Sequence, residues 1–172
     1  MHTSRIIRSA LVVWLPLSLF SGSALASTST FAPSLAVLAQ DSVLCYSAEV
    51  RINDKLSVAL SRQAQAIMLK TLNGLALSAR QDNALDSCDR QLFFSFSVDN
   101  AGAPTTFNDE LKLITFTATD GGVELRPAII WTDGFWGGNA KVLSPVTYTK
   151  MMQNDLVKLL SEFTADYRSI VR

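Results

Sequence analysis

Apolar and polar residues alternate over four segments of the chain, which predicts four β-strands. The segments are 43–52, 91–98, 111–119 and 123–131. The second segment, QLFFSFSV, is the clearest, because every second residue from Leu92 to Val98 is a large apolar one, while Ser95 and Ser97 share the other face with Phe93. Asp120-Gly121-Gly122 predicts a hairpin turn between the third and fourth strands, and Pro127 indicates an edge or a bulge in the fourth.

Two further segments carry apolar residues at helical spacing. The first, 55–72, follows possible capping residues Asn53 and Asp54 and ends near Gly74. The second runs from an expected N-cap at Ser144 to residue 170, and its apolar residues step by three or four positions. In the first helix these residues are Leu56, Leu60, Ile67 and Thr71; in the second they are Met152, Leu156, Leu159, Phe163, Tyr167 and Ile170.

The order of these elements, β-α-β-β-β-α, predicts an α+β fold. The expected architecture is a two-layer sandwich in which two long helices lie on one face of a mixed four-stranded sheet. The first helix then joins two parallel strands by a right-handed crossover. Residues 75–87 fit either a short helix or a loop.

The first twenty-six residues have the pattern of a cleaved signal peptide for the general secretory route. Arg5 and Arg8 precede the apolar segment 10–20, and Ala24-Leu25-Ala26 supplies small residues for cleavage. We therefore expect residues 1–26 to be removed, 27–40 to form a flexible leader, and 41–172 to form a single α+β domain in the periplasm or outside the cell. An uncleaved signal anchor is the alternative.

Cleavage after Ala26 also limits the chemistry that remains. It removes His2, the only histidine, and with it Ser-His-Asp and Cys-His catalysis and histidine-ligated zinc. The sequence contains neither of the two common nucleotide-binding glycine motifs, so we expect no cofactor and assign no catalytic residue. Loss of Arg5 and Arg8 leaves a slightly acidic chain, which disfavours nucleic acid as a partner. No later apolar run predicts a transmembrane anchor.

Cys45 and Cys88 are the two cysteines of the sequence. In an exported protein, two cysteines most simply form one disulfide. A cross-link over this separation stabilises a fold by about 4 kcal/mol in the chain-entropy model. A zinc site would need two additional carboxylates, so we expect no metal.

The candidate binding site is the segment 131–139, WTDGFWGGN. It is expected to be an open, glycine-rich loop that presents Trp131, Asp133, Phe135, Trp136 and Asn139. Flat aromatic faces beside polar groups suit a sugar ring or a peptide. In the alternative interpretation, Trp131 ends a strand in the core while Phe135 and Trp136 fold back as an apolar plug under the last helix.

These features predict an exported, non-enzymatic accessory protein that binds an envelope protein or cell-wall glycan through the segment 131–139. Two alternatives stay open. Asp109, Glu110, Glu124 and Asp133 would serve a carboxylate-based polysaccharide hydrolase if two of them face one cleft, although we expect them to be solvated. A free sheet edge near Pro127 would suit a homo-oligomeric structural subunit, and the sequence does not set the oligomeric state.

Overall fold

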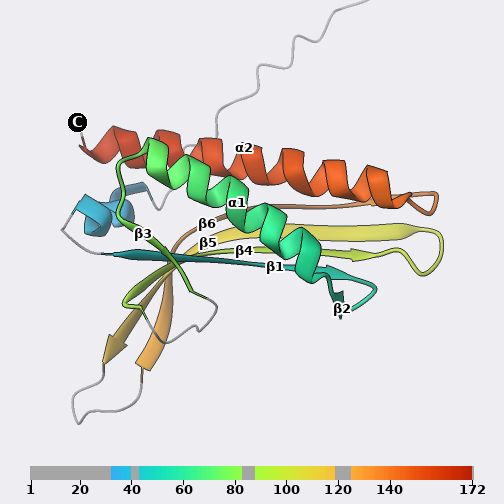
Figure 1. Cartoon of the computed structure of the whole chain (residues 1–172), viewed down its shortest axis with the longest axis horizontal. Coiled ribbons are helices and arrows are strands. Elements are labelled where there is room, and N and C mark those ends of the chain that lie inside the picture. The colour runs from blue at the N-terminus through green and yellow to red at the C-terminus, as the bar shows by residue number, and fades with distance from the viewer. Residues whose placement is uncertain (1–31, 40–42, 83–87, 119–124, 172) are drawn as a thin grey trace, which may run out of the picture.

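A computed structural model describes residues 32–39, 43–82, 88–118 and 125–171 of the chain. Two helices lie over the same face of a β-sheet (Figure 1). The elements are η1 (Ala32–Ala39), β1 (Leu44–Ile52), β2 (Lys55–Leu56), α1 (Val58–Gly74), β3 (Ala79–Gln81), β4 (Arg90–Asp99), β5 (Thr105–Ala118), β6 (Leu125–Asn139) and α2 (Pro145–Val171).

The sheet has six strands in the order β2-β1-β4-β5-β6, and β3 pairs with β1. β1 runs parallel to β3 and β4, and the other pairs are antiparallel. The mixed sheet with two long helices on one face is as predicted, but the count of four strands was wrong. β2 and β3 have two and three residues, which is too short for an alternating pattern to reveal them.

The turn after β1 differs from the prediction that it caps α1. Asn53 and Asp54 have φ angles of 49° and 61° and form the tight turn between β1 and β2. Asn and Asp tolerate this left-handed conformation, which two-residue hairpin turns require. The helix begins three residues later than expected, with Ser57 as its N-cap. Its buried face runs through Ala64, Met68 and Leu72, while Leu56 lies outside the helix and is exposed.

β5 and β6 form a longer ribbon than the sequence predicted. β5 begins at Thr105 rather than at residue 111, and β6 continues through the segment predicted to be a loop. The two strands pair without interruption from Thr105–Asn139 to Leu113–Trp131, where a bulge interrupts the register. Beyond this bulge the ribbon bends away from the helices (Figure 1), as bulges allow. The predicted turn 120–122 lies outside the described residues.

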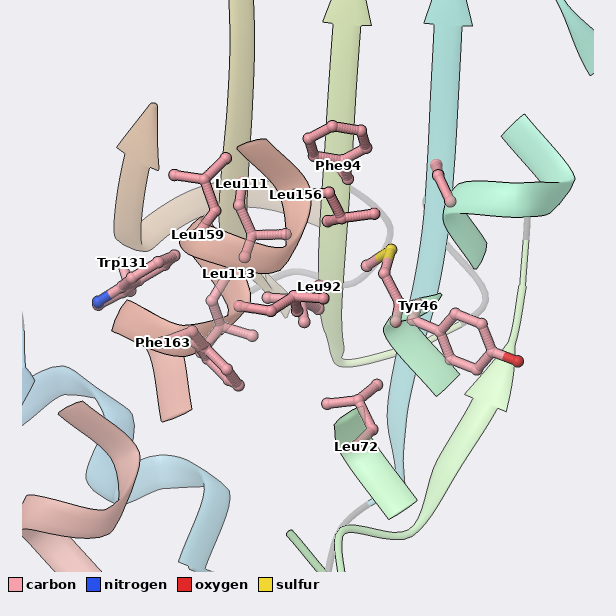
Figure 2. Close-up of a cluster of buried hydrophobic side chains, with 14 of the residues drawn as sticks. Tyr46, Leu72, Leu92, Phe94, Leu111, Leu113, Trp131, Leu156, Leu159 and Phe163 are labelled. Atoms are coloured by element: carbon pink, nitrogen blue, oxygen red, sulfur yellow. The ribbon is translucent and has the colours of Figure 1, made fainter. Parts of the chain in front are cut away.

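The core lies between the sheet and the helices. Figure 2 shows side chains of β1, β4, β5 and β6 meeting those of α1 and α2. The four alternating residues of β4 face this core as predicted, and so does the stripe of α2, in which Ile170 is partly buried and the rest are buried. The predicted N-cap is also confirmed, because the Thr147 N–H donates to Ser144 Oγ over 3.2 Å.

Part of the segment expected to be a flexible leader is folded. η1 contacts α2 and β6, and it buries Leu35 and Leu38 completely or nearly so. The expectation of flexibility is therefore corrected for residues 32–39. Burial of two leucines offsets part of the entropy cost of ordering this short helix. The Ser-, Thr- and Ala-rich composition of residues 27–40 did not suggest such a helix.

Neither long helix of the described chain is apolar enough over a sufficient length to cross a bilayer.

Candidate functional site

The five predicted site residues lie on β6 and are divided by the alternation of the strand. Trp131, Asp133 and Phe135 point toward the helix layer, whereas Trp136 points to the opposite, uncovered face. Asn139, the last residue of β6, is exposed. The structure thus does not gather these residues into one loop. It separates a buried aromatic residue from an exposed one.

Trp131 is part of the core. Its side chain is fully buried and meets the Phe163 ring edge-on, with 5.3 Å between the ring centroids (Figure 2). Its indole Nε1–H donates to Asp166 Oδ2 over 2.9 Å, which satisfies its polar atom. The prediction that Trp131 belongs to a binding surface was therefore wrong, and the alternative that it ends in the core is confirmed.

The glycines near Phe135 allow β6 to pack closely rather than holding a loop open. A Cβ on Gly134 would lie 2.5 Å from the backbone oxygen of Asp109, and one on Gly137 would lie 2.6 Å from the Phe107 ring. Phe135 itself is half-buried under α2, where Lys158 Nζ lies 4.1 Å from its ring centroid. The plug interpretation therefore holds for Phe135 and fails for Trp136.

Trp136 is 88% exposed, the most exposed of the large apolar side chains in the described chain. It borders a hollow of about 680 Å³ formed by residues 97–99, 104–108 and 136–140 together with Asp54. The hollow lies at the end of the sheet where β4 turns into β5 and where β6 ends (right-hand side of Figure 1). Of the predicted site residues, Trp136 and Asn139 line it.

A hydrogen-bond network around Asn100 fixes the turn beside this hollow. Asn100 Nδ2 donates to the Leu143 carbonyl over 2.7 Å, and its Oδ1 accepts the Leu143 N–H over 2.7 Å. The Thr105 hydroxyl contacts Asn100 Oδ1 at 2.8 Å, and Asn53 Oδ1 accepts the Asn100 N–H over 2.6 Å. No local pattern in the sequence indicated that Asn100 joins three separate segments.

Asp109 departs most strongly from the expectation that the acidic residues are solvated. It is 1% exposed and lies between the sheet and α2, where its Oδ1 accepts the Phe135 N–H over 3.0 Å. Its buried Oδ2 has no donor among the described residues unless Asp109 or Asp155 carries a proton. Burial, followed by the nearby charge of Asp155, raises the pKa of Asp109 from 3.8 to about 7. Burial likewise raises the pKa of Asp155.

Glu110 points to the opposite face of the sheet, as adjacent strand residues must. It accepts a hydrogen bond from the Thr132 hydroxyl over 3.0 Å and pairs with Lys112 over 2.7 Å. Asp133 accepts the Gly134 N–H over 2.8 Å, and Glu124 lies outside the described residues. Asp109 and Glu110 therefore do not converge on one cleft, and Asp109 does not line the Trp136 hollow.

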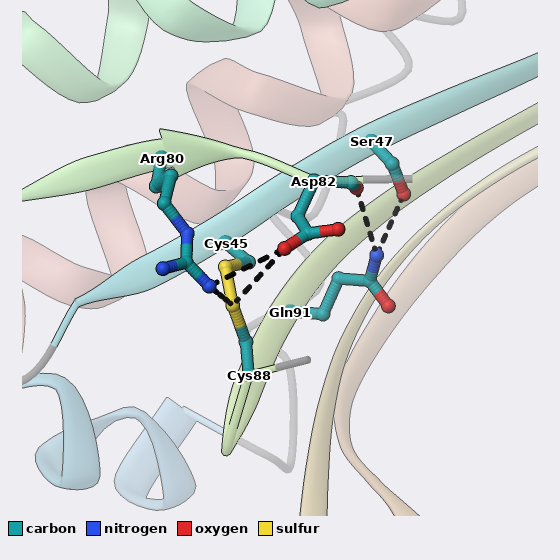
Figure 3. A network of polar contacts seen from close by, with 6 residues as sticks. All are labelled: Cys45, Ser47, Arg80, Asp82, Cys88 and Gln91. Atoms are coloured by element: carbon teal, nitrogen blue, oxygen red, sulfur yellow. Dashed lines mark hydrogen bonds and ion pairs between the residues drawn. A yellow bond between two sulfur atoms is a disulfide. The ribbon is translucent and has the colours of Figure 1, made fainter. Parts of the chain in front are cut away.

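The predicted disulfide is confirmed. Cys45 is the second residue of β1, Cys88 precedes β4, and these neighbouring parallel strands bring the two sulfurs together (Figure 3). Arg80 Nη2 lies 3.1 Å from Cys88 Sγ and 3.3 Å from Asp82 Oδ2. Potential ligand atoms of Cys45, Asp82 and Cys88 lie within 4.8 Å of one another, but sulfurs joined in a disulfide supply no thiolate to a metal.

Comparison with known proteins gives no family. No family model matches the chain, and no curated protein matches its sequence. Similar solved structures are a PelC dodecamer from Paraburkholderia phytofirmans (15% identity, 72% of this chain and 88% of that chain, TM-score 0.40) and protein XCC0632 from Xanthomonas campestris, of family DUF330 (10%, 72% and 81%, 0.38). A third is a putative neuraminyllactose-binding hemagglutinin homolog from Helicobacter pylori (8%, 72% and 81%, 0.41). At these identities and TM-scores, no property of theirs is transferred to this chain.

Proposed function

We propose that this protein is an exported, non-enzymatic binding protein that recognises an envelope partner protein through Trp136 and the adjoining hollow, the Trp136 surface. The observation that carries the proposal is the exposure of Trp136. An indole ring that is 88% exposed on a β-strand contributes little to the core, yet it is a large, rigid and adhesive contact.

The supporting framework of the hollow favours specific recognition. Its walls come from three paired strands, and the Asn100 network ties the adjacent turn to both Asn53 and Leu143. A preformed surface loses little conformational entropy when a partner binds. The proposal thus narrows the predicted segment 131–139 to Trp136 and Asn139 and adds residues from β4 and β5.

The disulfide between Cys45 and Cys88 supports export, since such bonds persist in oxidising compartments. The periplasm or the extracellular space is therefore the proposed location. Mass analysis of the purified protein tests the export step: a mature terminus at Ser27 and no alkylatable thiol are expected. An intact Met1 with two alkylatable thiols in a cytosolic fraction contradicts it.

The binding proposal is tested by Trp136→Ala in a cross-linking capture from the envelope fraction. We expect the variant to lose the captured partner while its unfolding free energy stays within about 1 kcal/mol of the parent, because little area is buried there. Trp136→Phe retains a ring and should retain partial capture. Val157→Ala, which shortens another exposed apolar side chain on α2, is the matched control and should behave as the parent.

Capture that is unchanged in Trp136→Ala would contradict the proposal. Loss of capture together with a large loss of stability would also contradict it, because that result assigns Trp136 a structural role. Enrichment of cell-wall glycan instead of protein would keep the surface but replace the partner class.

One observation supports a second candidate, a homo-oligomeric structural subunit. β6 is an edge strand of fifteen residues, and no strand of the described chain pairs with its outer side. Such an edge is available for pairing with another copy. Size-exclusion chromatography with light scattering tests this candidate, and a monomer at all concentrations examined rejects it.

A further inference from the structure

We propose that the Trp136 surface recognises a basic segment of the partner, with a Lys or Arg side chain seated between the indole ring and the carboxylates of Asp54 and Asp99. This inference rests on the proposed binding function and specifies the chemistry of the partner. The hollow that Trp136 borders is lined by these two acidic residues, and no lysine or arginine is among its lining residues.

The two carboxylates come from separate elements that the fold brings together. Asp54 lies in the turn after β1, and Asp99 is the last residue of β4. The Asp99 Oδ1 accepts the Ala101 N–H over 3.3 Å, which orients its carboxylate at the start of the turn. Both side chains are exposed, so a bound cation would gain charge-assisted hydrogen bonds that water otherwise satisfies.

Arg51, a cation that neighbours Asp54, does not fill the site. Arg51 lies on the neighbouring strand, where its Nε donates to Glu49 and its Nη1 donates to the backbone oxygen of Asp54 over 3.2 Å. The guanidinium is therefore held by Glu49 and by the turn, and it is not a lining residue of the hollow. Arg51 also attracts the Asp54 carboxylate electrostatically. The side chains of Asp54 and Asp99 are nevertheless both exposed and accessible to an external positive charge.

An exposed indole ring complements this charge. Cations bind over tryptophan faces more strongly than over other aromatic rings, and the apolar stem of Lys or Arg also covers the ring. Arginine has the additional planar fork that pairs with carboxylates. Phosphate backbones and anionic lipid headgroups are repelled by the same two acids, whereas a neutral glycan would use the ring without needing them.

The test measures binding of a tetra-arginine peptide to the purified chain by titration calorimetry or NMR. The comparison probes are tetra-citrulline, which is a neutral isostere, and chitotetraose as a neutral glycan. Tetra-arginine should bind, and both comparison probes should bind at least about tenfold more weakly. Raising NaCl to about 0.5 M should weaken the binding further, because exposed charges are screened.

Two variants separate charge from structure. The double change Asp54→Asn and Asp99→Asn should weaken tetra-arginine binding roughly tenfold. Asparagine tolerates the positive φ of residue 54 and retains a side-chain oxygen at residue 99 for the Ala101 N–H, so the fold is preserved. Glu162→Gln removes an exposed acid from α2 and is the matched control, with no expected change.

Equal binding of tetra-arginine and tetra-citrulline, or full binding by the double variant, would overturn this inference. Preferential binding of chitotetraose, or no binding of any probe, would overturn it as well. These failures are distinct from failure of the proposed function, which is decided by partner capture with Trp136→Ala. A partner captured through Trp136 but insensitive to Asp54 and Asp99 would leave the function standing and reject the cationic segment.

Discussion

Replacing the buried Asp109 by Asn should remove a pH-dependent loss of stability from this fold. Asp109 lies under α2 with one oxygen bound to the Phe135 N–H and the other facing Asp155. Asparagine has the same shape, keeps an acceptor for Phe135 and gains an N–H that a carboxylate at Asp155 can accept. The substitution therefore removes a buried charge while preserving the local hydrogen bonds.

The magnitude follows from the pKa of Asp109, which burial and Asp155 raise from 3.8 to about 7. Between these two values the folded chain retains a proton that the unfolded chain has released, so the free energy of unfolding falls as pH rises. The stability that this retained proton contributes is fully present below pH 3.8, declines between pH 3.8 and pH 7, and is lost above pH 7. A difference of about 3 pKa units corresponds to about 4 kcal/mol.

The assay is urea unfolding of the parent and of Asp109→Asn at several pH values between 4 and 8. At pH 8 the variant should be more stable than the parent by roughly 2–4 kcal/mol, and the difference should vanish or reverse near pH 4. Glu162→Gln, on the exposed face of α2, should follow the parent at every pH. A variant that loses stability at pH 8, or one with the parent's pH dependence, would refute the reasoning.

Three further predictions concern packing and covalent structure. Gly134→Ala should destabilise the fold by about 2 kcal/mol or more in thermal unfolding, because its Cβ would meet a backbone oxygen at 2.5 Å; Gly102→Ala, with nothing within 4 Å, should be nearly neutral, and equal effects would contradict this account. Replacing Cys45 and Cys88 together by alanine should cost about 4 kcal/mol in urea unfolding, and an unchanged midpoint would argue against the cross-link. Trp131→Phe leaves a cavity and removes the indole hydrogen bond, so we expect a loss of about 2–3 kcal/mol in the same assay; a loss below 1 kcal/mol would argue against its burial.

The elements that the sequence predicted correctly are those whose pattern follows from simple burial on one face. β4 alternates because the helix layer covers only one of its faces. α2 carries an apolar stripe because only one of its faces packs on the sheet. The parallel pairing of β1 and β4 through α1, and with it the disulfide from Cys45 to Cys88, also follows from element order.

The segment 131–139 shows what local patterns do not determine. Its glycines and polar residues suggest a loop, yet pairing with β5 satisfies its backbone and makes it a strand. Pairing then decides by alternation that Trp131 enters the core while Trp136 is exposed. The hydrophobicity of the two tryptophans is the same, so only the register with β5 distinguishes them.

The sequence by itself determined the two long helices, the core of the longer strands, the parallel pairing of β1 and β4, the disulfide and the expectation of export, because each depends on periodicity, element order or residue type. Only the tertiary structure decided which charged groups are neighbours. Asp109 meets Asp155 across the interface of the sheet with α2, and Asp54 and Asp99 line the same hollow as Trp136 at the end of the sheet. Electrostatic free energies depend on the distance between charges and on their burial. For residues far apart in the chain, both are set only when the helices pack on the sheet.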